Sequence, residues 1–306
     1  MTASLSAGLG PVPRSYLFVP ATRPDRFEKA LASGADAVIF DLEDAVAASE
    51  KKVARRTVGE FLRSLDRVAP KLSSRSPELW VRTNPPPLGL VDLEIVACEQ
   101  LDGVCPAKTG SREELLTLDR WLEELACGAI VEPLVEDARA LLDAVDIASG
   151  PRVRRLHLGE GDLAADLGLD SSDRRAALAG ARHMVVLASA AAHLDSPVAP
   201  VSTDYRNPSS FEEETRYLRS LGFWSRACIH PTQVLVANEV FVVSQAEIDW
   251  ADDVLGRLHD AALDGKGVAV GADGRMIDEA IARTARRLRR MAGPDRSGGD
   301  AGTDTG

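Results

Sequence analysis

The chain has 306 residues, of which 45% are hydrophobic, 27% charged and 5% aromatic, a balance that excludes collagen-like, wholly disordered and short disulfide-rich proteins. The 47 acidic residues outnumber the 36 basic ones, and the net charge of −11 argues against nucleic-acid binding, which needs clustered basic charge. No apolar run reaches the roughly 20 residues of a membrane-spanning helix, and the first residues lack the basic and apolar segments of a secretory signal. We therefore expect a cytoplasmic protein with neither nucleic-acid nor membrane partners.

Short apolar, β-rich runs alternate along the chain with longer stretches of helical periodicity. Eight runs are expected to form strands, and they begin at Ser15, Ala37, Leu79, Gly103, Ala129, Arg154, Ser196 and Arg226. Helices are expected at residues 26–32, 111–125, 137–148 and 174–192, and the second opens with Ser111 and Glu114 at the spacing of a capping box. Eight strand–helix units favour a TIM (β/α)₈ barrel over an open doubly wound sheet.

The C-terminal region continues beyond what a barrel needs. Helices are expected from Pro231 to about His259 and from Ile277 to Met291, with a glycine-rich hairpin or loop between them. The final residues contain almost no apolar side chains, which is typical of a disordered tail. We therefore divide the chain into a flexible N-terminus (1–13), the barrel (14–230), a C-terminal helical appendage (231–292) and the tail (293–306).

Polar and charged residues stand at the ends of several expected strands. In a TIM barrel the active site is built from the carboxyl ends of the strands and the loops that follow them. The residues at these positions are Asp41, Glu43, Asp44, Arg82, Asn84, Lys108, Glu136, Glu160, Asp162 and His230. Carboxylates that converge on one mouth repel one another unless a cation neutralises them, and two carboxylates with several waters suit Mg²⁺.

Glu136 and Asp162 are the best-placed carboxylates for a metal because they follow adjacent strands. The spacing leaves a second interpretation open, in which each of them caps the helix that follows. Arg82 ends an apolar strand, where a permanent charge needs a partner. It either binds the carboxylate or thioester oxygen of a substrate or pairs with Glu43 or Asp44, and both roles can coexist.

Cysteines and most histidines are interpreted as structural residues. The four cysteines form no C-x-x-C pair and stand at no zinc-finger spacing from a histidine, as in a reduced protein with small core thiols. His230 follows the eighth strand, where an uncharged hydrogen-bonding role and a catalytic role both stay open. No Walker motif, G-x-S-x-G elbow or H-E-x-x-H sequence is present, which excludes several large enzyme classes.

Several linked motifs give the chain a resemblance to a known family. Between about Arg14 and Met291 it carries, in order, RSYLFVP, GADAVIFDLEDAV, VRTN, PAK, LVE, LGEGDLAADLG and CIHPTQV. In this combination the chain resembles the citrate lyase β-subunit-like CoA-ester lyases of the HpcH/HpaI aldolase superfamily, above all stand-alone bacterial homologues such as citramalyl-CoA lyases. It departs from the family pattern at Ala107, inside the PAK motif, and at Ala21, where a glycine is common.

The resemblance implies a role for each matching residue. Arg82 of VRTN would bind the substrate, Glu136 of LVE would bind both Mg²⁺ and the substrate, and Asp162 of GEGD would be the second metal ligand. Glu43 and Asp44 form the acidic pair of the LED motif. They would support Arg82 or the waters of the metal, and we count them with it as catalytic candidates.

The resemblance also implies a partner subunit and a ligand. Asp278, within RMID, would enter the site of a neighbouring subunit and transfer a proton, which implies a homotrimer or hexamer. The ligand would be a CoA thioester, whose phosphates could contact Arg14, Arg23 and Arg26 at the rim.

The implied activity is that of an oxo-acid lyase that breaks a carbon–carbon bond with Mg²⁺, or alternatively Mn²⁺. The substrate would be a 3-hydroxyacyl-CoA of the citramalyl-, malyl- or citryl-CoA type, and the products acetyl-CoA and a 2-oxo acid. The alternatives are hydrolysis of malyl-CoA in a thioesterase or malate synthase-like reaction, an aldolase acting on free hydroxy-keto acids, and a subunit that works only within a complex.

Overall fold

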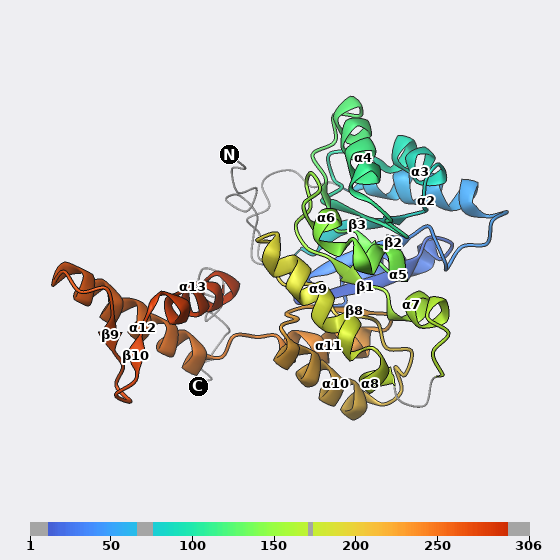
Figure 1. The fold of residues 1–306 in the computed structure, drawn as a ribbon. Coiled ribbons are helices and arrows are strands. Elements are labelled where there is room, and N and C mark those ends of the chain that lie inside the picture. Colours follow the sequence, from blue (N-terminus) through green and yellow to red (C-terminus); the bar gives the residue numbers. More distant parts are fainter. Residues whose placement is uncertain (1–11, 66–75, 171–173, 293–306) are drawn as a thin grey trace, which may run out of the picture. The chain divides into compact units, whose positions relative to one another are not determined.

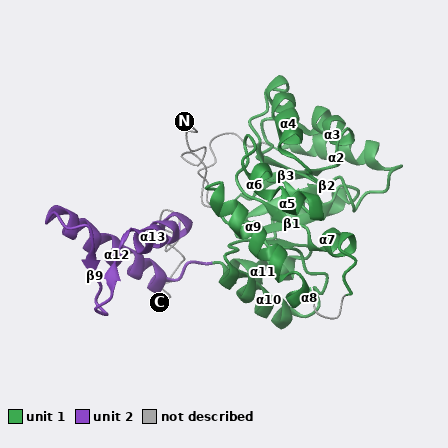
Figure 2. Ribbon diagram, in the orientation of Figure 1, with its two compact units in different colours: residues 1–8, 13–241 green, residues 9–12, 242–306 purple. Residues whose placement is uncertain are grey.

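The computed structural model describes residues 12–65, 76–170 and 174–292. The expected disordered tail, and the expected flexible N-terminus apart from residues 12 and 13, lie outside the described residues. The described chain forms two compact units, one of residues 13–241 and one of residues 242–292 together with residue 12 (Figures 1 and 2). None of the described helices combines the length and apolar content that crossing a membrane requires.

Parallel strands form a closed ring in the first unit. They are β1 (Ser15–Pro20), β2 (Ala37–Asp41), β3 (Glu78–Thr83), β4 (Gly103–Pro106), β5 (Ile130–Val131), β6 (Leu134–Val135), β7 (His157–Leu158) and β8 (Arg226–Cys228). One sheet runs in the order β5-β4-β3-β2-β1-β8, and β6 pairs with β7. Parallel bridges from Val131 to Val153, from His157 to Val198 and from Ala199 to Arg226 close the ring. The expectation of a TIM barrel is confirmed.

Prolines explain where the expected strands are short. The fifth divides into β5 and β6 on either side of Glu132 and Pro133, and the seventh is reduced to bridges at Val198 and Ala199. Pro133 interrupts the fifth strand, and prolines precede and follow the bridged pair of the seventh. Because proline has no N–H group to donate, it shortens the ladder wherever it stands in a strand.

Helices cover the outside of the ring (Figure 1). They are η2 (Pro24–Arg26, a 3₁₀ helix), α1 (Phe27–Leu31), α2 (Lys51–Ser64), α3 (Leu88–Val96), α4 (Arg112–Glu124), α5 (Ala138–Leu142), α6 (Ala144–Ala148), α7 (Glu160–Asp166), α8 (Arg174–Ala177), α9 (Ala179–Ala191), α10 (Pro208–Leu221) and α11 (Pro231–Val240). The helices expected at 137–148 and 174–192 are each broken in two, at Asp143 and at Leu178.

Two helix ends differ in detail from what the sequence suggested. Ser111 accepts a hydrogen bond from the backbone N–H of Glu114, as expected, but the Glu114 carboxylate accepts from the N–H of Gly110. The long helix expected from Pro231 ends at Val240. This helix, α11, packs on β1 and β8 as the helix of the eighth unit, so the first compact unit extends to residue 241.

Two apolar layers hold the barrel together. Inside the ring lie Tyr16, Ile39, Trp80, Val198 and Ala227 with their neighbours, and a larger shell lies between the strands and the helices. Because side chains alternate along a strand, each strand sends one set of residues into the ring and the other toward the helices. The four cysteines are free thiols, and three of them are buried, in agreement with the interpretation of small core thiols.

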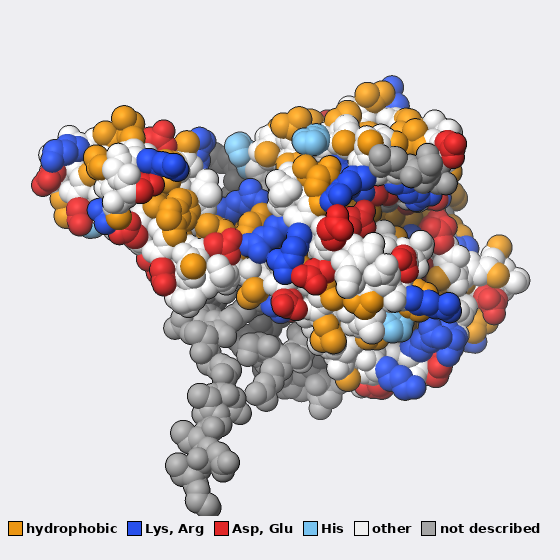
Figure 3. All heavy atoms as spheres, turned by 90° about the horizontal axis from the view of Figure 1, so that it is seen from below, with side chains coloured by type: hydrophobic (Ala, Val, Ile, Leu, Met, Phe, Trp, Pro, Cys, Tyr) orange, Lys and Arg blue, Asp and Glu red, His pale blue; other side chains and the backbone are white. Residues whose placement is uncertain are grey.

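The second unit is a pair of helices with a hairpin between them. It consists of α12 (Gln245–Leu263), β9 (Ala269–Val270), β10 (Met276–Ile277) and α13 (Glu279–Ala292). The two helices pack together, the strands are antiparallel, and Ser244 and Glu247 form a capping box at the start of α12. Figure 3 shows apolar side chains exposed on this unit, and Leu263, Val270 and Met276 are each more than half exposed.

Candidate active site

Arg82, at the end of β3, is held inside the barrel mouth by the end of the neighbouring strand. Its Nε and Nη2 donate to the two carboxylate oxygens of Asp41, each at 2.7 Å, and its side chain is 12% exposed. The guanidinium also lies 5.2 Å from the ring centre of Phe18. Burial opposes the charge, but the hydrogen bonds to Asp41 and the nearby carboxylates outweigh it and raise the pKa of Arg82. The group is therefore a permanent, oriented cation.

The acidic pair after β2 lies beside this cation. Arg82 Nη1 is 3.3 Å from the Glu43 carboxylate and 3.4 Å from that of Asp44. Glu43 is buried whereas the Asp44 side chain is 58% exposed, and burial raises the pKa of Glu43. The two expected partners are thus present, but Asp41, a strand-end residue with no predicted role, holds Arg82 most closely.

Lys108, after β4, connects the remaining carboxylates of the mouth. Its backbone N–H donates to Glu136 Oε1 at 2.6 Å, and its Nζ donates to Asp162 Oδ2 at 2.7 Å. The same Nζ lies 3.6 Å from Glu43. Lys108 has a φ of 50°, in the left-handed region that costs energy for a residue with a side chain. The backbone after Ala107 is therefore strained in the conformation that makes the Glu136 contact.

Glu136 and Asp162 follow the adjacent parallel strands β6 and β7, as expected. Neither caps a helix: Asp137 caps α5 through the N–H of Ala140, and α7 begins at Gly159 without a side-chain cap. Neither carboxylate therefore makes a capping hydrogen bond, although Asp162 lies in the first turn of α7, where a negative charge suits the helix dipole. Their role as ligands stays open.

Gly159 lets the Glu136 side chain lie against the end of β7. A Cβ atom on Gly159 would stand 2.5 Å from the Cβ of Glu136 and 2.8 Å from its Oε2. Contacts of this length do not occur between folded side chains, so only glycine leaves room for this carboxylate.

The Glu136 carboxylate is costly to keep ionised where it lies. Burial, together with the nearby carboxylates of Asp162 and Glu43, raises its pKa to about 7, against the opposing effects of the Lys108 N–H and the Arg82 charge. A divalent cation between Glu136 and Asp162 would relieve both the burial cost and the repulsion.

These two carboxylates fit a hydrated divalent cation better than an enclosed one. Among the residues that the structure describes, no three His, Cys, Asp or Glu side chains gather closely enough to surround a metal ion. Mg²⁺ keeps several waters and takes one or two carboxylates, whereas zinc and calcium sites draw more ligands from the protein. The Asp162 side chain is 43% exposed, which leaves space for such waters.

Three other candidates lie elsewhere or act differently. Arg14 precedes β1, at the opposite end of the barrel, and pairs with Asp36 at 2.7 Å, so its expected place at the rim is wrong. His230 caps α11 by accepting from the N–H of Thr232. Asp278 belongs to the second unit, where its carboxylate accepts from the first N–H groups of α13.

Asn84, which was expected at a strand end, and Lys51, to which the sequence assigned no role, support the mouth from behind. Lys51 donates to the carbonyl oxygens of Leu42 and Glu43 and to Asn84 Oδ1, and Asn84 in turn donates to Leu42 and to Asp92. These bonds hold the β2 and β3 ends together. A lysine soon after the acidic LED motif is the only sequence signal that could have indicated this support.

A second buried polar network lies inside the barrel. Glu132 accepts hydrogen bonds from Tyr16 at 3.0 Å and Arg154 at 2.7 Å, and lies 2.8 Å from His157 Nε2. Burial alone would raise the pKa of Glu132, but Arg154, His157 and Arg155 hold it at about 2, while burial lowers the pKa of His157. A neutral His157 that donates to an ionised Glu132 satisfies both groups, so His157 is structural, as expected.

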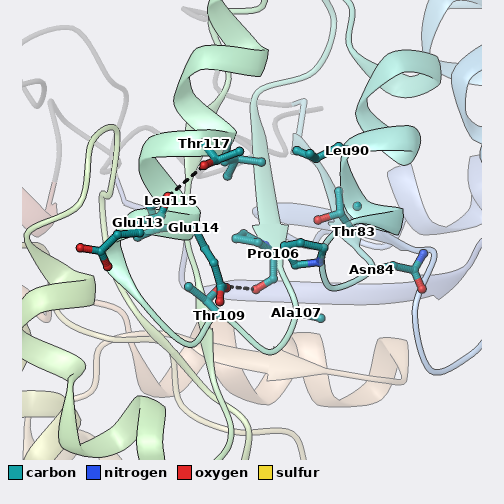
Figure 4. A pocket seen from close by; sticks show the side chains of 13 residues that line it. Thr83, Asn84, Leu90, Pro106, Ala107, Thr109, Glu113, Glu114, Leu115 and Thr117 are labelled. Carbon is teal, nitrogen blue, oxygen red and sulfur yellow. Dashed lines mark hydrogen bonds between the residues drawn. The ribbon is translucent and has the colours of Figure 1, made fainter.

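A cavity of about 230 Å³ lies between α3 and α4, outside the ring (Figure 4). Thr83, which faces away from the barrel because its neighbour Arg82 faces inward, lines it together with Leu90, Pro106 and Leu115. The Thr83 hydroxyl is buried and has no hydrogen-bond partner among the described residues. The cavity contains none of the predicted catalytic or metal-binding residues, so it is separate from the mouth.

The model of the HpcH/HpaI aldolase/citrate lyase family matches residues 14–231, which include all the strands of the barrel. The chain belongs to this family. With citrate lyase and malyl-CoA lyase among its relatives, the chain is an enzyme of the citrate lyase/malyl-CoA lyase family, whose lyases are classed as oxo-acid lyases.

Curated relatives and solved structures cover nearly the whole chain. A (3S)-malyl-CoA thioesterase of Cereibacter sphaeroides is 33% identical over 90% of this chain and 92% of its own. An L-malyl-CoA/β-methylmalyl-CoA lyase of the same species is 30% identical over 91% and 94%. The CitE protein of Mycobacterium tuberculosis, in complex with magnesium, acetoacetate and coenzyme A, matches with a TM-score of 0.69 and 30% identity over 94% of this chain and 99% of its own.

Proposed function

We propose that the protein is a Mg²⁺-dependent lyase that cleaves a 3-hydroxyacyl-CoA of the malyl-, citramalyl- or citryl-CoA type into acetyl-CoA and a 2-oxo acid. The observation that carries the proposal is the oriented Arg82 cation at the same strand ends as Glu136 and Asp162. A relative of known structure binds magnesium together with coenzyme A, which supports both ligands.

The residues of the mouth would have separate roles in binding the metal and the substrate. Glu136 and Asp162 would hold Mg²⁺, which supplies a Lewis acid for the carboxylate and hydroxyl oxygens of the substrate. Arg82 would bind the thioester carbonyl oxygen, and Asp41 keeps its guanidinium in one orientation by two hydrogen bonds. Lys108 positions Glu136 through its backbone N–H.

The proposed reaction breaks one carbon–carbon bond and moves one proton. A base removes the hydroxyl proton, the C–O group becomes the carbonyl of the 2-oxo acid, and the electrons of the broken bond pass to the thioester oxygen. Arg82 would stabilise the negative charge that forms on that oxygen. An acid then protonates the enolate carbon to give acetyl-CoA. We propose Asp278 for this transfer, supplied by a neighbouring subunit of a homotrimer or hexamer.

A thioesterase is the second candidate, because one of the relatives covering nine-tenths of the chain is a (3S)-malyl-CoA thioesterase. Such an enzyme would release free CoA and a hydroxy acid, whereas the lyase releases acetyl-CoA and a 2-oxo acid. The products therefore separate the two candidates directly.

The deciding experiment is product analysis by mass spectrometry with malyl-CoA, citramalyl-CoA and citryl-CoA, each with Mg²⁺ and with EDTA. Acetyl-CoA and one 2-oxo acid, lost on chelation and in Asp162→Asn, would support the lyase and identify its substrate. Free CoA without acetyl-CoA would favour the thioesterase. Turnover by Asp162→Asn equal to that of the unchanged protein would contradict the metal assignment.

A further inference from the structure

A largely buried series of alternating charges connects the start of α7, through α9 and α10, to β8. Arg182, on α9, donates to both carboxylate oxygens of Glu160 at 2.5 and 2.9 Å, and its side chain is 1% exposed. The same guanidinium donates to Glu214 of α10 at 3.2 Å, and the other oxygen of Glu214 accepts from Arg226 of β8 at 2.5 Å. The negative charges of two carboxylates thus balance the positive charges of two guanidinium groups.

The helix that this series anchors is the one that carries Asp162. Helix α7 has only seven residues, and Gly159 supplies no side-chain cap at its start. Glu160 is its first residue and Asp162 its third. A helix this short has little stability of its own, so its first turn depends on tertiary contacts.

The ion pair of Asp162 with Lys108 is too exposed to hold the Asp162 side chain in one position. Lys108 Nζ reaches the carboxylate at 2.7 Å, but both side chains are 43% exposed. Exposed ion pairs of lysine contribute little because water and side-chain freedom compete with them. The buried, bidentate pair of Arg182 and Glu160 is by contrast fixed in distance and in plane.

This arrangement is not the one that stability alone would select. Arg182 Nη1 is buried and has no hydrogen-bond partner within the described ranges. An unpaired buried donor lowers stability, and apolar side chains can often replace a buried ion pair without loss. A polar group retained at such a cost calls for another explanation.

We propose that Arg182 is a positioning residue of the metal site: through Glu160 it fixes the first turn of α7 and so holds Asp162 where it can share a divalent cation with Glu136. The inference rests on the proposed function, because it takes Asp162 as a metal ligand. It predicts that the pair of Arg182 and Glu160 acts on metal affinity rather than on binding of the thioester.

The test replaces the pair by apolar residues of similar size, in Glu160→Met/Arg182→Leu, which leaves Glu214 paired with Arg226. Thermal unfolding reports stability, and electron paramagnetic resonance of free Mn²⁺ reports metal binding without substrate. We expect an unfolding temperature close to that of the unchanged protein and a Kd for Mn²⁺ raised at least tenfold. In turnover, the Mg²⁺ concentration for half activity should rise while the KM for the thioester at saturating Mg²⁺ stays the same.

Three controls make the outcomes distinguishable. Arg175→Leu removes an exposed arginine that pairs with Glu213 and should leave the Mn²⁺ affinity unchanged. Asp162→Asn should lose Mn²⁺ binding, and a Kd equal to that of the unchanged protein would overturn the proposed metal site itself. If Asp162→Asn loses the metal while Glu160→Met/Arg182→Leu keeps it, the positioning role of Arg182 is refuted. Should the double variant not fold, Glu160→Gln decides the same question, because an unchanged Kd in that folded variant would also refute the role.

Discussion

Gly159→Ala gives the sharpest test of the site geometry, because it adds one methyl group at a single, defined contact. The backbone of Gly159 has a φ of −95°, which alanine adopts without strain, so the effect arises from packing alone. The new Cβ would lie 2.5 Å from the Cβ of Glu136, whereas carbon atoms pack at about 3.5 Å or more. Glu136 must therefore move by about 1 Å.

A displacement of this size predicts a large loss of activity and a smaller loss of stability. Misplacing a catalytic group by about 1 Å can cost ~100-fold in rate, which corresponds to about 2.7 kcal/mol of transition-state stabilisation. Overpacking destabilises a fold by about 1–3 kcal/mol, so the variant should remain folded at room temperature. The measurements are kcat/KM for the thioester, the Kd for Mn²⁺ and the unfolding temperature.

Gly161→Ala is the matched control, two residues further along the same segment. A Cβ on Gly161 would meet no atom within 4 Å, and alanine favours the helix that begins there. We expect this variant to keep its activity and to be slightly more stable. A Gly159→Ala enzyme within threefold of the unchanged kcat/KM, or an equal loss in Gly161→Ala, would refute the reasoning.

Three further predictions follow from the same contacts. Arg82→Lys should lower kcat by about 100-fold or more, because lysine cannot make both 2.7 Å bonds to Asp41 or present a planar donor pair to the substrate; near-normal steady-state turnover would leave Arg82 as a structural ion pair. Asp278→Asn and Asp162→Asn should each be inactive alone but regain activity when the two chains are co-expressed, since a mixed oligomer contains sites with both residues intact; an active Asp278→Asn enzyme would rule out its role in proton transfer. The contribution of His157 to the free energy of unfolding should fall as the pH drops below about 6.5, because burial lowers its pKa and the unfolded chain then binds more protons, while Glu136, whose pKa is raised to about 7, acts in the opposite direction. In urea unfolding, the free-energy difference between the unchanged protein and His157→Gln should therefore decrease below about pH 6.5, and a difference independent of pH would contradict the assignment. The contribution of Glu132 should fall by about 3 kcal/mol between pH 4.5 and 2 as it protonates.

The sequence alone determined the architecture, because the hydrophobic periodicity of each segment predicts whether it forms a strand or a helix of the barrel. Eight apolar runs alternate with amphipathic stretches, and all eight contribute to the closed ring. The rule that strand ends carry the chemistry then selected Arg82, Glu136 and Asp162, which the structure brings to one mouth. Both inferences depend only on the order of residues along the chain and on the direction of parallel strands.

Tertiary structure decided which of these groups contact one another. Asp41 rather than Glu43 or Asp44 makes the close pair with Arg82, because the register of β2 against β3 sets Asp41 opposite Arg82. The φ of 50° at Lys108, which turns its N–H toward Glu136, is a property of the folded loop and of no sequence pattern.

The pair of Arg182 and Glu160 gives the clearest case of what only the tertiary structure could determine. The sequence places Glu160 among the strand-end carboxylates of the mouth and indicates no role for Arg182, 22 residues further along, so nothing in it predicts that they pair. They become partners because the packing of α7 and α9 on the barrel buries both side chains, and a buried charge must find its opposite. Periodicity decides which face of an element is buried; only the packed fold decides what each buried charge meets there.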